Sequence, residues 1–213
     1  MLKGVNILEK DFSNLAVYKL HMKKFALLFL LFILLIPGIK GQGKRTALLL
    51  IDIQDFYFPG GKSELIGPDK AAANAALLLE KFRKKALLVI HVRHNSEPGG
   101  AINKMVTPLQ GEKIISKSEV NSFKGTDLQQ YLKSQSIDSL IICGMQTHMC
   151  VEAATRAASD LGYKCVLIHD ACATKDLKFG EKVIKAEDVH YSTLSTLRSY
   201  CSILSTSEFL NPE

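Results

Sequence analysis

The 213-residue sequence has no CxxC pair, no internal repeat and no low-complexity tract. Its five cysteines are an odd number and stand singly, at Cys143, Cys150, Cys165, Cys172 and Cys201. The missing pair spacing excludes the usual cysteine-rich metal sites. A chain of this length, 47% hydrophobic, is about the size of one α/β domain with a sizeable core.

A concentrated positive charge is also missing. The net charge is +6, but residues 1–41 contain six lysines against two acidic residues, so that about +2 remains for the rest of the chain. This remainder is small and scattered. We therefore expect no nucleic acid or other polyanion as a partner.

No apolar run approaches the roughly 20 residues that span a bilayer. The longest, Phe25–Ile36, follows two lysines and precedes a polar stretch, as in a signal peptide at about residues 22–41. We therefore expect a leader over residues 1–41, with Met22 as the natural start, and an exported domain, periplasmic or secreted, over residues 42–213. The alternatives are an uncleaved anchor, which would bring the chain to a membrane, and a buried helix. Export would permit disulfides and leaves open which cysteines pair.

Short apolar runs alternate with helical stretches in the second part of the chain. The apolar runs predict strands at Thr46–Ile53, Ala86–Val92, Lys113–Lys117, Asp138–Gly144, Lys164–Asp170 and Cys201–Ser205. The stretches between them predict helices at 69–84, 126–134, 149–161 and 180–197, and a long loop at 94–112. This alternation is typical of a single α/β domain, with a mostly parallel six-stranded sheet and helices on both faces, as in three-layer Rossmann-like folds.

Three polar side chains come at or just after the ends of predicted strands, namely Asp52, Lys117 and Cys150. A helix N-terminus or a neighbouring cation lowers the pKa of a thiol, and we expect Cys150 to have both. Asp52 is then placed to accept the thiol proton. Thr147 is expected to cap the helix, leaving backbone N–H groups near Cys150 for an oxyanion. Taken singly, such residues are more often a packing cysteine, a turn former and a surface charge.

Three segments together make the chain similar to the isochorismatase-like cysteine hydrolases, which include nicotinamidases and N-carbamoylsarcosine amidohydrolases. The segments are Ala47–Phe56, Lys117–Phe123 and Cys143–Thr174, and the resemblance covers about residues 45–209 in the expected order. It implies the isochorismatase-like α/β fold and a homo-oligomer.

The resemblance also implies roles for particular residues. Asp52 matches the family's catalytic acid and base, Lys117 its lysine, and Cys150 its nucleophile. A non-proline cis peptide is implied between Met145 and Gln146. It would turn the backbone amides of Gln146 and Cys150 toward the oxyanion.

One departure from the family pattern concerns metal. Nicotinamidases carry an Asp-x-His pair after the second strand, with a further His, as ligands of a divalent ion. Here Arg93 and Asn95 stand in place of the first two ligands. We therefore expect no metal and no other cofactor, and nicotinamide is a poor substrate candidate. The residues expected to line the substrate pocket are Gln54, Phe56, Phe58, His94, Asn95 and Phe123.

The expected function is hydrolysis of a small-molecule amide or related C–N bond through a thioester on Cys150. One alternative is a vinyl-ether or ester hydrolase of the isochorismatase type, which works by acid catalysis and needs no thiol. The other is a non-catalytic binding protein that has kept the fold.

Overall fold

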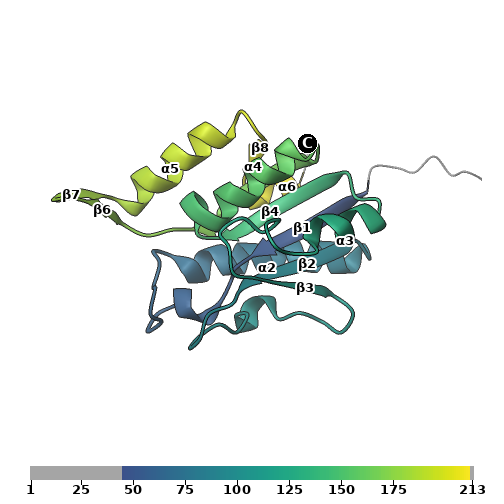
Figure 1. The fold of residues 1–213 in the computed structure, drawn as a ribbon, viewed down its shortest axis with the longest axis horizontal. Coiled ribbons are helices and arrows are strands. Elements are labelled where there is room, and N and C mark those ends of the chain that lie inside the picture. The colour runs from purple at the N-terminus through teal and green to yellow at the C-terminus, as the bar shows by residue number, and fades with distance from the viewer. Residues whose placement is uncertain (1–44, 212–213) are drawn as a thin grey trace, which may run out of the picture. The chain divides into compact units, whose positions relative to one another are not determined.

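The computed structural model describes residues 45–211, and a six-stranded sheet forms their centre (Figure 1). Every neighbouring pair in this sheet is parallel, and the strand order is β3-β2-β1-β4-β5-β8. The strands are β1 (Thr46–Ile51), β2 (Leu88–His94), β3 (Lys113–Lys117), β4 (Ser139–Met145), β5 (Lys164–Ala173) and β8 (Ser202–Leu204). The α/β fold with six parallel strands that the sequence predicts is confirmed.

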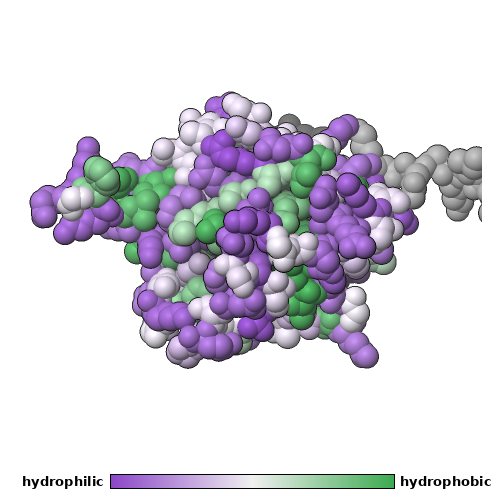
Figure 2. Space-filling view, in the orientation of Figure 1, coloured by the Kyte–Doolittle hydropathy of each residue, from purple (hydrophilic) through white to green (hydrophobic). Residues whose placement is uncertain are grey.

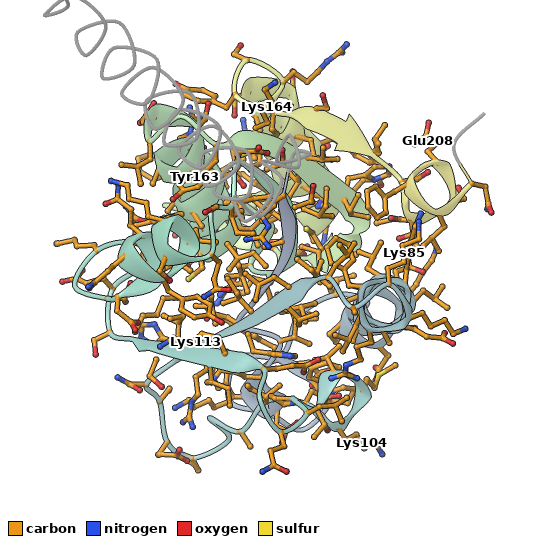
Figure 3. All side chains as sticks on the ribbon, turned by 90° about the vertical axis from the view of Figure 1, so that its right-hand side faces the viewer. Lys85, Lys104, Lys113, Tyr163, Lys164 and Glu208 are labelled. Carbon is orange, nitrogen blue, oxygen red and sulfur yellow. The ribbon has the colours of Figure 1, made fainter. Side chains whose placement is uncertain are left out.

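Helices cover both faces of the sheet. They are α2 (Pro68–Lys84), α3 (Leu128–Ser134), α4 (Glu152–Asp160), α5 (Ala186–Leu197) and α6 (Thr206–Leu210), with 3-10 turns η1 (Asp55–Tyr57) and η2 (Lys104–Val106). Figure 3 shows Glu208 of α6 beside Lys85 at the end of α2 on one side of the sheet, and Tyr163, which follows α4, on the other.

Small residues let these helices lie close to the sheet. Helix α2 buries Ala71, Ala75 and Leu78 at a helical spacing, and α4 buries Ala154 and Ala158. A helix that presents alanine can approach a strand more closely than one that presents leucine. This packing holds the turn before α4 against the end of the sheet.

The predicted helix at 180–197 is wrong at its beginning. A hairpin of β6 (Leu177–Phe179) and β7 (Lys182–Ile184) stands there, and α5 begins only at Ala186. Gly180 opens the two-residue turn with a φ of 57°, a conformation that suits a tight hairpin and interrupts a helix. Helix α6 was not predicted.

The β6–β7 hairpin carries large apolar side chains in solvent. Phe179 is 83% exposed and Val183 is 53% exposed. Figure 1 shows the hairpin projecting beyond α5, and Figure 2 shows hydrophobic side chains among hydrophilic ones on it. The expected homo-oligomer stays a prediction.

The predictions for residues 1–41, including export and the membrane-anchor alternative, lie outside the described residues. Among residues 45–211, no helix has both the length and the apolar composition needed to cross a bilayer.

A cluster of charged side chains fixes the end of the long loop that follows β2. The cluster lies toward the N-terminal end of that strand. Glu112 accepts two hydrogen bonds of 2.8 Å from the guanidinium of Arg83, and its Oε2 also accepts from the backbone N–H of Leu109. The same oxygen lies 3.0 Å from Nε2 of the buried His91. These contacts tie the end of the loop to both α2 and β2.

Replacing Glu112 by glutamine is expected to lower the free energy of unfolding by about 1–3 kcal/mol, because charge-assisted bonds to a half-buried carboxylate are lost. Despite partial burial, the bonds from Arg83, Leu109 and His91 lower the pKa of Glu112 from 4.5 to about 2. The carboxylate therefore stabilises the fold above pH 4.5, and this contribution fades as the pH falls toward 2.

Urea unfolding at neutral pH and at about pH 3 measures this difference. The difference in the free energy of unfolding between the wild type and Glu112→Gln should be smaller at the lower pH. The control is Glu80→Gln, which breaks an exposed pair with Lys84 one helical turn away and should change stability little. An equal effect of both substitutions would contradict the role given to Glu112.

Candidate active site

The strand order places a topological switch point at the centre of the sheet. Strand β1 lies beside both β2 and β4, and the chain leaves β1 toward β2 and leaves β4 toward β5, in opposite directions. In open parallel sheets, ligands bind at the carboxyl ends of the strands at such a switch point. Asp52 follows β1 there, and Gln146 follows β4.

The ends of β1 and β4 approach each other unusually closely. A Cβ at Gly144 would lie 1.9 Å from the backbone oxygen of Ile51, and Gly144 has a φ of 131°. No other residue fits that position without moving one of the strands. The glycine thus brings the turn that carries Cys150 against the strand that carries Asp52.

Lys117 joins the three residues that the sequence singles out. Its Nζ lies 2.7 Å from Oδ2 of Asp52 and 3.2 Å from Sγ of Cys150. Strand β2 lies between β3 and β1, so the long lysine side chain is what crosses to Asp52. The predicted grouping of Asp52, Lys117 and Cys150 is present in the structure.

The ammonium group of Lys117 has more hydrogen-bond acceptors within reach than it has hydrogens to donate. Besides Asp52 and Cys150, Nζ lies 3.1 Å from the backbone oxygen of Glu119 and 3.4 Å from Nδ1 of His94. An ammonium donates three hydrogen bonds, so these four acceptors compete for it. A proton that moves among them changes which contacts are made.

Burial controls the ionisation of this site. Asp52 is 0% exposed, Lys117 1% and Cys150 6%. Burial raises the pKa of Asp52, and Lys117 opposes the rise. Burial and then the Asp52 carboxylate raise the pKa of Cys150 to about 12, again against Lys117.

The expectation that Cys150 has a lowered pKa is therefore wrong. One ammonium faces one carboxylate, and a thiolate would add a second buried anion without a second cation. Burial therefore disfavours two anions beside the single ammonium of Lys117.

Cys150 lies in η3 (Thr147–Val151), a single π-helical turn that continues directly into α4. The peptide between Met145 and Gln146, just before this turn, is cis. Thr147 does not cap the helix as expected. Its hydroxyl donates to the backbone oxygen of Ala173 and lies 3.0 Å from Nδ1 of His190, so it ties the turn to β5 and α5.

Gln54, expected in the substrate pocket, uses its side chain on the backbone. Its Oε1 accepts from the N–H of His94 at 2.7 Å, and its Nε2 donates to the backbone oxygens of His94 and Gly100. The side chain is fully buried. Gln54 therefore fixes the end of β2 and the following loop, through hydrogen bonds from its side chain to backbone groups.

The other expected pocket residues fall into different environments. His94 is partly buried beside Lys117, whereas Asn95 is exposed and its amide donates to Ser118. Phe56 and Phe58 are 6% and 7% exposed.

Phe123, also expected in the pocket, packs away from Cys150. Its ring stacks on Tyr163 with centroids 6.2 Å apart, and Tyr163 follows the C-terminal end of α4 (Figure 3). Cys150 lies before the N-terminal end of the same helix. This contact gives Phe123 a packing role at the far end of α4.

Tyr57 is a site residue that the sequence analysis missed. It is 6% exposed and its hydroxyl accepts a hydrogen bond from Nε2 of Gln146 at 3.3 Å. Burial raises the pKa of its hydroxyl, and the nearby Cys150 and Asp52 raise this pKa further. Its neighbours Phe56 and Phe58 carry the same aromatic signal, and only the 3-10 turn decides which ring reaches Gln146.

Within residues 45–211, no three histidine, cysteine, aspartate or glutamate side chains are grouped as metal ligands. Arg93, which stands where a family ligand would be, lies 3.5 Å from Glu97. The expected lack of a metal or other cofactor stays a prediction.

Comparison with known proteins finds consistent matches. A family model described as Isochorismatase domain matches residues 46–208. The isochorismatase family protein YddQ of Bacillus subtilis is 42% identical over 177 residues, covering 78% of this chain and 98% of YddQ. A maleamate amidohydrolase of Pseudomonas putida is 25% identical over 184 residues, covering 69% of this chain and 86% of its own length. The crystal structure of an isochorismatase from Pseudomonas putida superposes with a TM-score of 0.74 at 35% identity, covering 77% of this chain and 89% of that one.

Replacing Asp52 by asparagine is expected to lower the pKa of Cys150, because the carboxylate raises it. Replacing Lys117 by methionine should act in the opposite direction, because the ammonium is the cation that opposes the rise. The measurement is the pH dependence of iodoacetamide alkylation, followed on the Cys150 peptide by mass spectrometry.

The internal control is Cys201, which is more exposed and whose pKa burial raises to about 11. Its alkylation profile should be the same in all three proteins. A Cys150 profile that Asp52→Asn leaves unmoved would contradict the electrostatic coupling.

Proposed function

Because the chain belongs to the isochorismatase family and is a hydrolase, we propose that it cleaves a small-molecule amide or related C–N bond through a thioester on Cys150. The observation that carries the proposal is the contact of one buried ammonium, Lys117, with both Asp52 and Cys150. A nucleophile within reach of a proton acceptor, both oriented by a third group, is the arrangement that nucleophilic catalysis requires.

The first half of the reaction moves one proton and forms one bond. The thiol proton of Cys150 passes to the carboxylate of Asp52 as the sulfur attacks the substrate carbonyl. The backbone amides of Gln146 and Cys150 are the proposed donors to the tetrahedral oxyanion. Asp52 then gives its proton to the leaving amine, the C–N bond breaks, and a thioester remains.

The second half regenerates the enzyme. The Asp52 carboxylate takes a proton from a water molecule, whose oxygen attacks the thioester carbonyl. The C–S bond breaks, the acid product leaves, and the proton returns to the sulfur. Atoms balance with one water consumed for each amide cleaved.

Lys117 makes these steps possible in a buried site. A single negative charge moves between Asp52, the sulfur and the oxyanion, while the ammonium stays in contact with the first two. In a buried site, such a fixed cation stabilises the moving charge far more than it would in water. The raised pKa of the Cys150 thiol fits this scheme, since the proton leaves during the attack.

The amide substrate class draws support from a relative. The relative from Pseudomonas putida is named maleamate amidohydrolase, and its name describes cleavage of a C–N bond in a small acid amide. A vinyl-ether or ester hydrolase of the isochorismatase type is the alternative. Acid catalysis by Asp52 alone would serve it, without the sulfur.

Replacement of Cys150 by alanine separates these two reactions. We expect amide turnover to fall by at least about a thousand-fold, since the nucleophile is lost. The assay is a hydrolysis screen of small amides and carbamoyl compounds with the full chain. Added hydroxylamine should trap the thioester of the wild type as a hydroxamate.

The matched control is Cys165→Ala, which removes another buried thiol that lies at the beginning of β5, at the other end of the sheet. It should keep its activity if the protein stays folded. Amide turnover that survives Cys150→Ala would reject the thioester mechanism and favour acid catalysis.

A further inference from the structure

The side chain of Gln146 is buried and only half satisfied. Gln146 is 6% exposed, and its Nε2 donates to the hydroxyl of Tyr57. Its Oε1 is also buried and has no hydrogen-bond partner among residues 45–211. A buried acceptor left without a partner costs about 1–3 kcal/mol, so such a group calls for an explanation.

The carboxamide lies between the two chain segments that carry Asp52 and Cys150. Gln146 is the first residue after β4, and its backbone oxygen accepts from the N–H groups of Met149 and Val151, which flank Cys150. Tyr57 comes from the turn that follows Asp52. The Tyr57–Gln146 hydrogen bond therefore joins the segment of the base to the segment of the nucleophile.

We propose that Oε1 of Gln146 accepts a hydrogen bond from the N–H of the scissile amide, and that Tyr57 holds the carboxamide in the orientation for this contact. This inference rests on the proposed function and deepens it. It makes Gln146 a specificity residue that favours amides with an N–H over esters.

The chemistry of the two substrate classes supports this assignment. A primary or secondary amide brings an N–H donor beside its carbonyl, and this donor would satisfy Oε1. An ester of the same acid brings only acceptor oxygens and leaves Oε1 unsatisfied. Sites with a buried polar group discriminate strongly against a substrate that lacks its partner.

Tyr57 suits the positioning role because it stays protonated. Burial and the nearby Asp52 and Cys150 raise the pKa of its hydroxyl, so the group does not ionise during turnover. It therefore remains a neutral partner for Nε2 of Gln146 throughout the cycle. The tyrosine acts through Gln146 and is a positioning residue.

The test compares one amide with the matching ester. The probes are the p-nitroanilide and the p-nitrophenyl ester of the same small acid, assayed with the full-length protein. Gln146→Met keeps the volume of the side chain and removes its acceptor. We expect kcat/KM for the anilide to fall about ten- to a hundred-fold, with the ester changed much less.

A second variant guards against a failure to fold. Tyr57→Phe removes only a hydroxyl, and it should lower the anilide-to-ester ratio in the same direction by a smaller factor. The control Tyr163→Phe removes a buried hydroxyl without a hydrogen-bond partner among the described residues, at the far end of α4. It should leave the ratio unchanged.

The outcomes separate this inference from the proposed function. Parallel losses on anilide and ester in both variants, or a ratio equal to that of wild type, would overturn the role of Gln146. Turnover of the anilide that persists in Cys150→Ala, or a wild type that cleaves neither probe, would instead overturn the thioester mechanism on which the inference rests.

Discussion

The ion pair between Lys117 and Asp52 is the constraint on which the rest of the site depends. Both side chains are almost completely buried, at an Nζ to Oδ2 distance of 2.7 Å. Either charge alone would be very costly in this interior, so the two must be brought together from separate strands. The same cation lies 3.2 Å from Cys150, so the ion pair also brings Asp52 and Cys150 to one ammonium group.

The parallel sheet satisfies this constraint by its strand order. With β1 at the centre, the carboxyl ends of β1, β2 and β3 lie side by side, and β4 follows on the other flank. Gly144 permits the close contact of β1 and β4, and Gln54 secures the end of β2 by bonding to the backbone of His94. Gly144 and Gln54 thus help to determine where Asp52, Lys117 and Cys150 lie.

Sequence reasoning succeeded for the elements that depend on local pattern. The apolar run of β1 is buried on both faces, and such runs predict strands of a parallel sheet. It failed where a contact from elsewhere in the chain decided the outcome. Thr147 is a residue type that often caps helices, but its hydroxyl bonds to β5 and α5. The pKa of Cys150 is raised by burial, although the residue lies just before a helix. At the beginning of the predicted helix at 180–197, Gly180 opens the turn of a hairpin, and α5 begins only at Ala186.

By itself, the sequence determined the fold class and the order of the strands along the chain, because apolar periodicity is a local property. It also singled out Asp52, Lys117 and Cys150, at or just after the ends of strands, as candidates. The tertiary structure alone decided which side chains share the site. It placed Tyr57, rather than Phe56 or Phe58, against Gln146. It also stacked the ring of Phe123, which the sequence had placed in the substrate pocket, on Tyr163. The charge state of the site also belongs to the tertiary structure, since desolvation depends on every segment that packs around a buried group.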